Sequence, residues 1–118
     1  MSEIRATTIS DETGNGPIAL TKQSAAKAWT NSSSTTIRDS FGISSFTDNG
    51  TGDFSHALTN SFSSADYAMA AAGFSGGSRT VVFDSAATAS DARIHTYLSS
   101  SGALSDTSST FALFGDLA

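Results

Sequence analysis

Apolar and polar residues alternate with a period of two along much of the chain, which is typical of β-strands that bury one face. The segment 93–98 shows the pattern best. Its two faces carry different residues: Ile94, Thr96 and Leu98 on one, and Arg93, His95 and Tyr97 on the other. Further short strands are predicted over residues 18–22, from about residue 27, and over 36–39, 41–47, 53–58, 67–73, 79–84 and 110–115.

Individual segments differ in how clearly they show two faces. Residues 53–58 place Phe54, His56 and Leu58 on one side, whereas residues 41–47 carry Phe41 and Ile43 on one side and Phe46 on the other. Residues 79–84 are predicted to be the clearest buried strand.

The strongest turn signal is the sequence Asp48-Asn49-Gly50-Thr51-Gly52. Asparagine and glycine tolerate positive φ, so these residues predict a hairpin between the flanking strands. Their oxygens could also serve as calcium ligands, but the segment lacks the spacing and the bidentate glutamate of an EF-hand loop. We therefore assign a structural role to Asp48, Asn49, Gly50 and Gly52, with the side chains of Asp48 and Asn49 capping their own backbone.

Residues 65–72 are rich in alanine and would be helical by propensity alone. The serine and glycine residues on either side favour a strand over 67–73 instead. Such small side chains leave a flat surface. Another backbone could approach it closely, as at a three-fold axis, or it could pack tightly between two sheets, and the sequence leaves both options open.

Composition supports an all-β fold in one domain. The chain has 118 residues, of which 38% are hydrophobic and 14% charged, and serine and threonine make up roughly a third. Hydroxyl side chains compete with helical hydrogen bonds and suit strands and turns. We predict a small antiparallel β-sandwich of about seven to nine short strands over residues 17–118, preceded by an extended N-terminal arm over residues 1–16.

Charge and composition exclude several classes of partner. The formal net charge of −5 and the scattered basic residues argue against binding to nucleic acid and to acidic membranes. No apolar run approaches the length of a membrane-spanning helix, so no membrane insertion is expected. The absence of cysteine excludes disulfides and thiolate metal sites. The polar N-terminus lacks the pattern of a signal peptide and indicates synthesis in the cytoplasm.

The candidate chemistry is sparse, and no catalytic, metal or cofactor site is predicted. Residues 73–77 match G-x-S-x-G, but the best strand follows this segment and the chain is too short for a hydrolase, so a hairpin turn is the favoured interpretation. His56 and His95 lack an H-x-H partner, and an exposed or hydrogen-bonded strand histidine is expected for each. Trp29 is expected in the core or between subunits rather than as a platform for sugars.

Arg93, His95 and Tyr97 share one face of a predicted strand. They are our candidate contact surface for a receptor, although an ordinary solvated face would have the same pattern.

An ordered set of segments resembles a β-domain of tail-fibre and receptor-binding proteins from tailed bacteriophages. These segments are residues 14–23 (GNGPIALTKQ), 25–31 (AAKAWTN), 36–45 (TIRDSFGISS), 47–54 (TDNGTGDF), 65–68 (ADYA) and 110–116 (TFALFGD). The resemblance covers the chain from residue 14 to its end. The long shaft of full fibres is missing, and the loop after Trp29 is short and rich in serine.

The resemblance implies a non-enzymatic structural protein of the virion that forms part of a tail fibre or tail tip and takes part in assembly and host attachment. It also implies a β-sandwich, usually a homotrimer. Expected partners are further copies of the chain, other virion proteins through the N-terminal arm, and a glycan or protein on the host surface. The alternatives are a stand-alone carbohydrate-binding module and a capsid decoration or head-fibre protein of the same fold.

Overall fold

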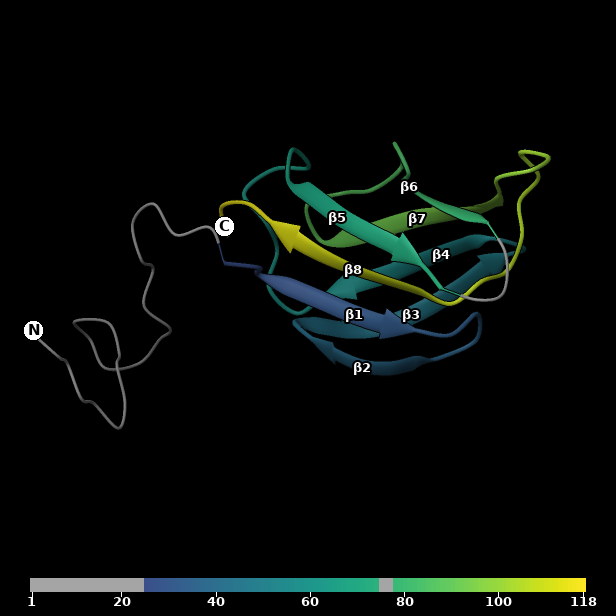
Figure 1. The fold of residues 1–118 in the computed structure, drawn as a ribbon. Helices are drawn as coiled ribbons and strands as arrows, with labels where there is room; N and C mark the ends of the chain where they lie inside the picture. Colours follow the sequence, from purple (N-terminus) through teal and green to yellow (C-terminus); the bar gives the residue numbers. More distant parts are fainter. Residues whose placement is uncertain (1–24, 75–77) are drawn as a thin grey trace, which may run out of the picture.

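Eight β-strands in two antiparallel sheets make up the described part of the chain (Figure 1). The computed structural model describes residues 25–74 and 78–118. Sheet A contains, in spatial order, β2 (Ile37–Phe41), β1 (Ala28–Ser32), β8 (Ser109–Phe114) and β5 (Ala68–Gly73). Sheet B contains β3 (Ile43–Gly50), β4 (Asp53–Leu58), β7 (Asp91–Leu98) and β6 (Arg79–Phe83). The predicted all-β sandwich is confirmed.

The predicted arm over residues 1–16 and the predicted strand over residues 18–22 lie outside the described residues. Within the described ranges, no helix is long and apolar enough to cross a membrane.

Most connections cross from one sheet to the other. β2 and β3 are joined by Gly42 alone, which has a positive φ of 72°. A Cβ atom there would lie 3.0 Å from the Lys27 carbonyl oxygen, so glycine suits this crossing on two counts. The hairpin predicted at residues 73–77 is wrong, because β5 pairs with β8 in sheet A and β6 pairs with β7 in sheet B. Residues 75–77 of that motif are outside the described ranges.

The core lies between the inner faces of the two sheets. Its best-buried side chains come from the alternate positions of β4, β7 and β8, as the period of two requires. The buried apolar residues are Ala28, Phe54, Leu58, Phe62, Tyr67, Ala92, Ile94, Phe111 and Leu113. Aromatic rings contact one another in the core, and Phe62 stacks on Tyr67 at a centroid distance of 4.3 Å.

Two strands differ from the sequence prediction. In β3 the register shifts between Ile43 and Ser45, and this irregularity lets both Ile43 and Phe46 pack against the core. Alternation alone predicts them on opposite faces. The sequence also predicts residues 79–84 to be the clearest buried strand, yet β6 is an edge strand of sheet B, and 42% of the Val82 surface is exposed.

The interior also contains a polar section. Its buried polar residues are Thr30, Ser32, His56, Thr96, Thr107 and Ser109. His56 is fully buried, with its ring edge-on to Phe46 and Phe111. Neither ring nitrogen has a regular hydrogen-bond partner within the described ranges. The expectation of an exposed histidine is therefore wrong for His56, and its polar contact with the Ala92 backbone falls short of regular hydrogen-bond geometry.

The hairpin predicted between residues 47 and 53 joins β3 and β4, and Asp48 caps its backbone as expected. The Asp48 carboxylate accepts a hydrogen bond from the Gly50 backbone N–H at 2.9 Å. Asn49 instead donates to the Ser55 hydroxyl at 2.8 Å. Gly52 has a φ of 65°, and its N–H donates to the Asp106 carboxylate at 2.7 Å. This last bond ties the turn to the segment that leads into β8.

His56 makes stability depend on pH. Burial lowers its pKa to about 4, partly opposed by the backbone of Ala92, whereas an unfolded histidine has a pKa of 6.5. The unfolded state therefore binds a proton first, and stability is lost as the pH falls from 6.5 towards 4, by about 3 kcal/mol at the lower limit. Urea unfolding across this range should show the loss in the wild type and in His95→Asn, but not in His56→Leu. An equal slope in His56→Leu would contradict this assignment.

Gly52→Ala should destabilise the fold by about 2–4 kcal/mol, since the new Cβ adds a clash to an unfavourable φ. That Cβ would lie 2.5 Å from the Thr96 carbonyl oxygen. Gly102→Ala is the matched control, because Gly102 has a similar φ of 69° and an added Cβ there would meet no atom within 4 Å. Denaturant unfolding of both variants measures the difference, and equal losses would show that φ alone matters.

Candidate functional site

The outer face of sheet B carries a group of interacting polar side chains from β4, from β7 and from the residue that follows β6. We call Asp53, Asp84, Arg93, His95 and Tyr97 the polar cluster. The alternation in β4 and β7 turns Asp53, Arg93 and His95 away from the core, and the register places His95 opposite Asp53. Asp84 directly follows β6, and its backbone N–H donates to the Arg93 carbonyl oxygen. The structure thus brings together the three predicted contact residues and adds two aspartates.

Arg93 is held between the two carboxylates. Its Nε donates to Asp53 Oδ1 at 2.8 Å and its Nη2 donates to Asp53 Oδ2 at 2.6 Å. The same Nε lies 3.1 Å from Asp84 Oδ2. Two parallel hydrogen bonds fix the plane of the guanidinium group, so this pair is more rigid than a single surface contact.

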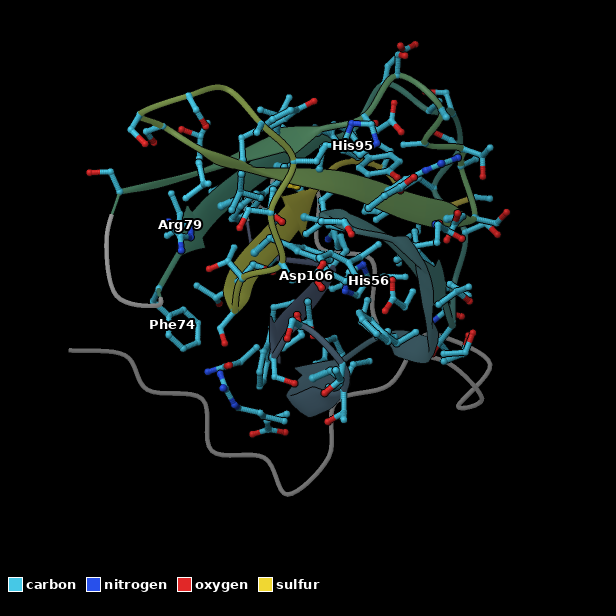
Figure 2. All side chains as sticks on the ribbon, turned by 90° about the vertical axis from the view of Figure 1, so that its right-hand side faces the viewer. His56, Phe74, Arg79, His95 and Asp106 are labelled. Atoms are coloured by element: carbon cyan, nitrogen blue, oxygen red, sulfur yellow. The ribbon has the colours of Figure 1, made fainter. Side chains whose placement is uncertain are left out.

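His95 connects the carboxylates to Tyr97. Its Nε2 lies 3.3 Å from Asp84 Oδ2 and 3.6 Å from Asp53 Oδ1. Its Nδ1 lies 3.3 Å from the Tyr97 hydroxyl. A chain of polar contacts therefore runs along β7 from carboxylate to imidazole to phenol. Figure 2 shows His95 on the outer side of the sandwich, in contrast to the interior position of His56.

The charges of the cluster stabilise one another. The hydrogen bonds from Arg93 lower the pKa of Asp53, burial opposes them, and a hydrogen bond from Asn49 adds to the lowering. In turn Asp53 raises the pKa of Arg93. Both groups are therefore held in their charged forms.

Asp53, Asp84 and His95 place ligand atoms within 4.8 Å of one another, which is close enough to surround a metal ion. Arg93 Nε already lies 2.8 Å and 3.1 Å from their carboxylate oxygens. A metal ion would have to displace the guanidinium. The arrangement is better suited to contacts with polar groups of a ligand than to metal binding.

Asp84 and His95 follow the G-x-S-x-G match in the chain order of a hydrolase triad, and they do meet. However, the second nitrogen of His95 faces the Tyr97 hydroxyl. A nucleophile elbow joins a strand to a helix in a parallel sheet. Here the segment joins β5 and β6 in different antiparallel sheets, and the described residues contain no helix. The surroundings of the motif are those of a connecting loop.

The outer face of sheet A carries an apolar row. This row crosses its four strands and contains, in order, Phe41, Trp29, Ala112 and Ala70. Phe41 is 59% exposed and Trp29 is 37% exposed. The expectation that Trp29 lies in the core is therefore wrong, and of the two predicted positions only the one between subunits remains.

We call Phe41 and Trp29 the aromatic ridge, and Ala112 and Ala70 the alanine hollow. A shallow groove of about 490 Å³ runs beside Trp29 over β8 and β5. It is lined by Trp29, Ala70, Ala71, Ala72, Thr110, Phe111 and Ala112. The alanines of β5 thus form an open surface on the outside of the sandwich rather than tight packing between the two sheets.

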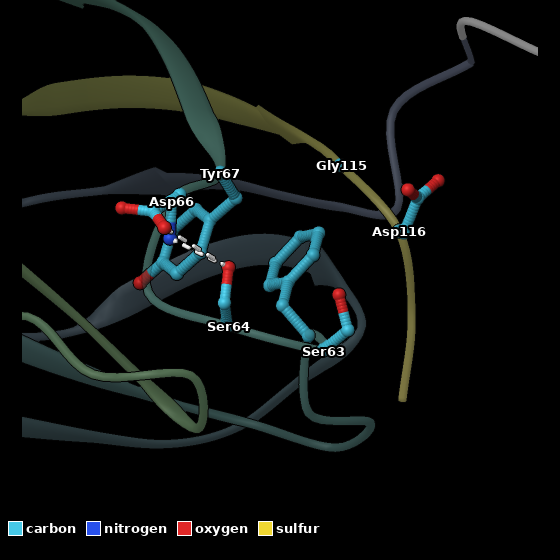
Figure 3. A pocket seen from close by; sticks show the side chains of 7 residues that line it. Ser63, Ser64, Asp66, Tyr67, Gly115 and Asp116 are labelled. Carbon is cyan, nitrogen blue, oxygen red and sulfur yellow. Dashed lines mark hydrogen bonds between the residues drawn. The ribbon is translucent and has the colours of Figure 1, made fainter.

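A second, smaller hollow of about 170 Å³ lies near the end of β8 (Figure 3). It is lined by Phe62, Ser63, Ser64, Asp66, Tyr67, Gly115 and Asp116. Ser64 interacts with Asp66, and the Ser63 N–H donates to the Asp116 carbonyl oxygen at 2.8 Å. A Cβ at Gly115 would lie 2.9 Å from the Tyr67 Cβ. These contacts close the end of the sandwich, so we assign a structural role to this hollow.

Comparisons with known protein families, with curated proteins and with solved structures find no match for this chain. Any functional conclusion therefore depends on the two outer faces and on the sequence resemblance.

Arg93→Met should raise the pKa of Asp53 towards the ordinary value of 3.8, because the hydrogen bonds from the guanidinium group are the largest cause of its lowering. An NMR titration of the aspartate carboxyl carbons measures the shift directly. Arg38→Met is the control, since Arg38 contacts Asn31, Ser108 and the Phe74 ring and not the cluster. An Asp53 titration unchanged in Arg93→Met would contradict the geometry of the pair.

Proposed function

We propose that this chain is a structural protein of a bacteriophage virion, part of a tail fibre or tail tip, that assembles through one outer face and contacts the host through the other. The observation that carries the proposal is the contrast between these faces. Sheet A exposes Phe41, Trp29 and alanines, whereas sheet B exposes a connected group of charged and hydrogen-bonding side chains.

The apolar face supports self-association. A soluble protein rarely exposes neighbouring large apolar side chains without a partner for them. The sequence resemblance suggests three copies and a particle-attachment role for residues 1–16. Under this proposal the protein is made in the host cytoplasm and functions in the virion without a cofactor.

The polar cluster supports receptor contact. It offers carboxylate acceptors, a guanidinium donor, an imidazole and a phenol on one rigid strand pair. Groups of this kind form hydrogen bonds to the hydroxyls of a glycan or to polar side chains of a surface protein. Because Arg93 is held by Asp53, little side-chain entropy is lost when a ligand binds.

A carbohydrate-binding module is the second candidate, and the exposed indole of Trp29 favours it. Aromatic rings on a sheet face can stack on sugar rings. The two candidates differ in the face they use. A glycan array with Trp29→Ala and Tyr97→Ala separates them, since a module that uses the aromatic ridge loses binding with the first substitution only.

The host-contact role predicts that labelled protein binds cells of the susceptible host, and that Arg93→Ala and Tyr97→Ala each lower this binding about tenfold or more, as expected for central contact residues. Flow cytometry measures the effect. Arg38→Ala is the control, because Arg38 is an exposed arginine of sheet A that contacts Asn31, Ser108 and the Phe74 ring and not the cluster. Full binding by both cluster variants would contradict the role of this face.

The virion role has an independent test. Cryo-electron microscopy of particles from the same phage should show density for the sandwich at the tail. Density on the capsid would support the decoration or head-fibre alternative, and absence of the protein from the particle would overturn the proposal.

A further inference from the structure

We infer that the outer face of sheet A binds a second copy of this chain face to face, with a two-fold axis that runs parallel to the strands. This inference deepens the self-association part of the proposed function and rests on it. It changes the expected number of copies from the three of the resemblance to two.

The cross-strand register carries the argument. The row Phe41, Trp29, Ala112 and Ala70 has two large side chains on one half and two small ones on the other. A two-fold axis along the strands, between β1 and β8, reverses the order of the row in the second copy. Phe41 then faces Ala70, Trp29 faces Ala112, and each ridge enters the hollow of the other copy. A face that is complementary to itself in this way is what a two-fold interface requires.

The next row fits the same axis. It contains Asp39, Asn31, Thr110 and Ala72, so Asn31 faces Thr110 of the second copy. The Thr110 hydroxyl donates to the Thr30 carbonyl oxygen at 3.0 Å and keeps its lone pairs. The Asn31 Oδ1 already accepts from Arg38, which leaves its NH₂ group to donate across the interface.

The distribution of charge favours a second copy of the chain over other partners for the outer face of sheet A. The two rows contain one charged residue, Asp39, which meets Ala72 of the second copy, so no like charges are brought together. The groove beside Trp29 is lined mainly by alanine and offers few groups that would orient a sugar. The negative charge of the chain and the carboxylates of sheet B make the opposite face a poorer surface for self-association.

The small size of the face indicates a weak pair. Four strands of five or six residues cover a flat area of roughly 350 Å². A standard interface buries about 800 Å² on each partner. We therefore expect the pair to form in the micromolar range and to dissociate on dilution.

The first experiment is light scattering of the full chain over a protein concentration of about 5 to 200 μM, which brackets the micromolar affinity expected. The expected mass rises from 12.0 kDa towards twice that value. Trp29→Ala should weaken association at least about 30-fold, as for a central aromatic residue, and Val82→Ala on sheet B should leave it unchanged. Trp29 is the only tryptophan, so its fluorescence should shift to shorter wavelength as the pair forms.

The second experiment exchanges ridge and hollow. Ala112→Trp alone should block pairing, because each introduced indole meets Trp29 of the other copy. A mixture of Ala112→Trp with Trp29→Ala should form mixed pairs, since every contact then joins one tryptophan to one alanine. The double variant Trp29→Ala/Ala112→Trp should pair with itself. Circular dichroism of each variant checks that the sandwich is folded.

The results of these experiments distinguish failure of the two-fold pair from failure of the proposed function. A monomer at the highest concentration overturns both the inference and the self-association proposal. A mass of three chains overturns the two-fold pair and supports the trimer. A pair that ignores the ridge and hollow substitutions overturns the inference and places the contact elsewhere, for example at the free edge of β5. If the protein is a monomer and Trp29→Ala abolishes its glycan binding, the outer face of sheet A binds sugars instead of a second copy.

Discussion

The pairing of β4 with β7 is the constraint on which both the core and the candidate site depend. Phe54 lies opposite Ile94 on the inner face, and one residue away Asp53 lies opposite His95 on the outer face. Because successive side chains point to opposite sides of a strand, burial of Phe54 and Ile94 also fixes the positions of Asp53, Arg93 and His95. A slip of one residue would bury the charges and expose the core, so the hydrophobic core maintains the polar cluster.

The two sheets have different outer faces, and this difference organises the functional proposals. Sheet B presents side chains that satisfy one another through hydrogen bonds and opposite charges. Sheet A presents aromatic and alanine side chains that find no comparable partners among the described residues of their own chain. Apolar surface gains free energy when a second surface covers it, whereas a polar cluster can exchange its contacts with water for contacts with a ligand. The proposed assembly on one side and recognition on the other follow from this division.

Part of this structure could be predicted because it depends on local pattern. The period of two placed Arg93, His95 and Tyr97 on one face, and the Asp48–Gly52 segment predicted the hairpin between β3 and β4. Other features depend on pairing between distant strands. Nothing in the sequence near Asp84 indicates that it meets His95, and the shift of register in β3 decides where Phe46 points. Alternation places His56 on the same face as Phe54 and Leu58, but only the packing of the second sheet leaves its ring nitrogens without a regular hydrogen-bond partner among the described residues.

The sequence by itself determined the fold class, the approximate strands and the residues that share each strand face, because these follow from alternation, turn chemistry and the scarcity of strong helix signals. The tertiary structure decided which face of each strand turns inward. Alternation separates two faces but does not orient them when both carry apolar groups, as around Trp29 and Phe41. Packing of one sheet on the other settles that choice, and it left the only tryptophan on the outside beside a surface of alanines.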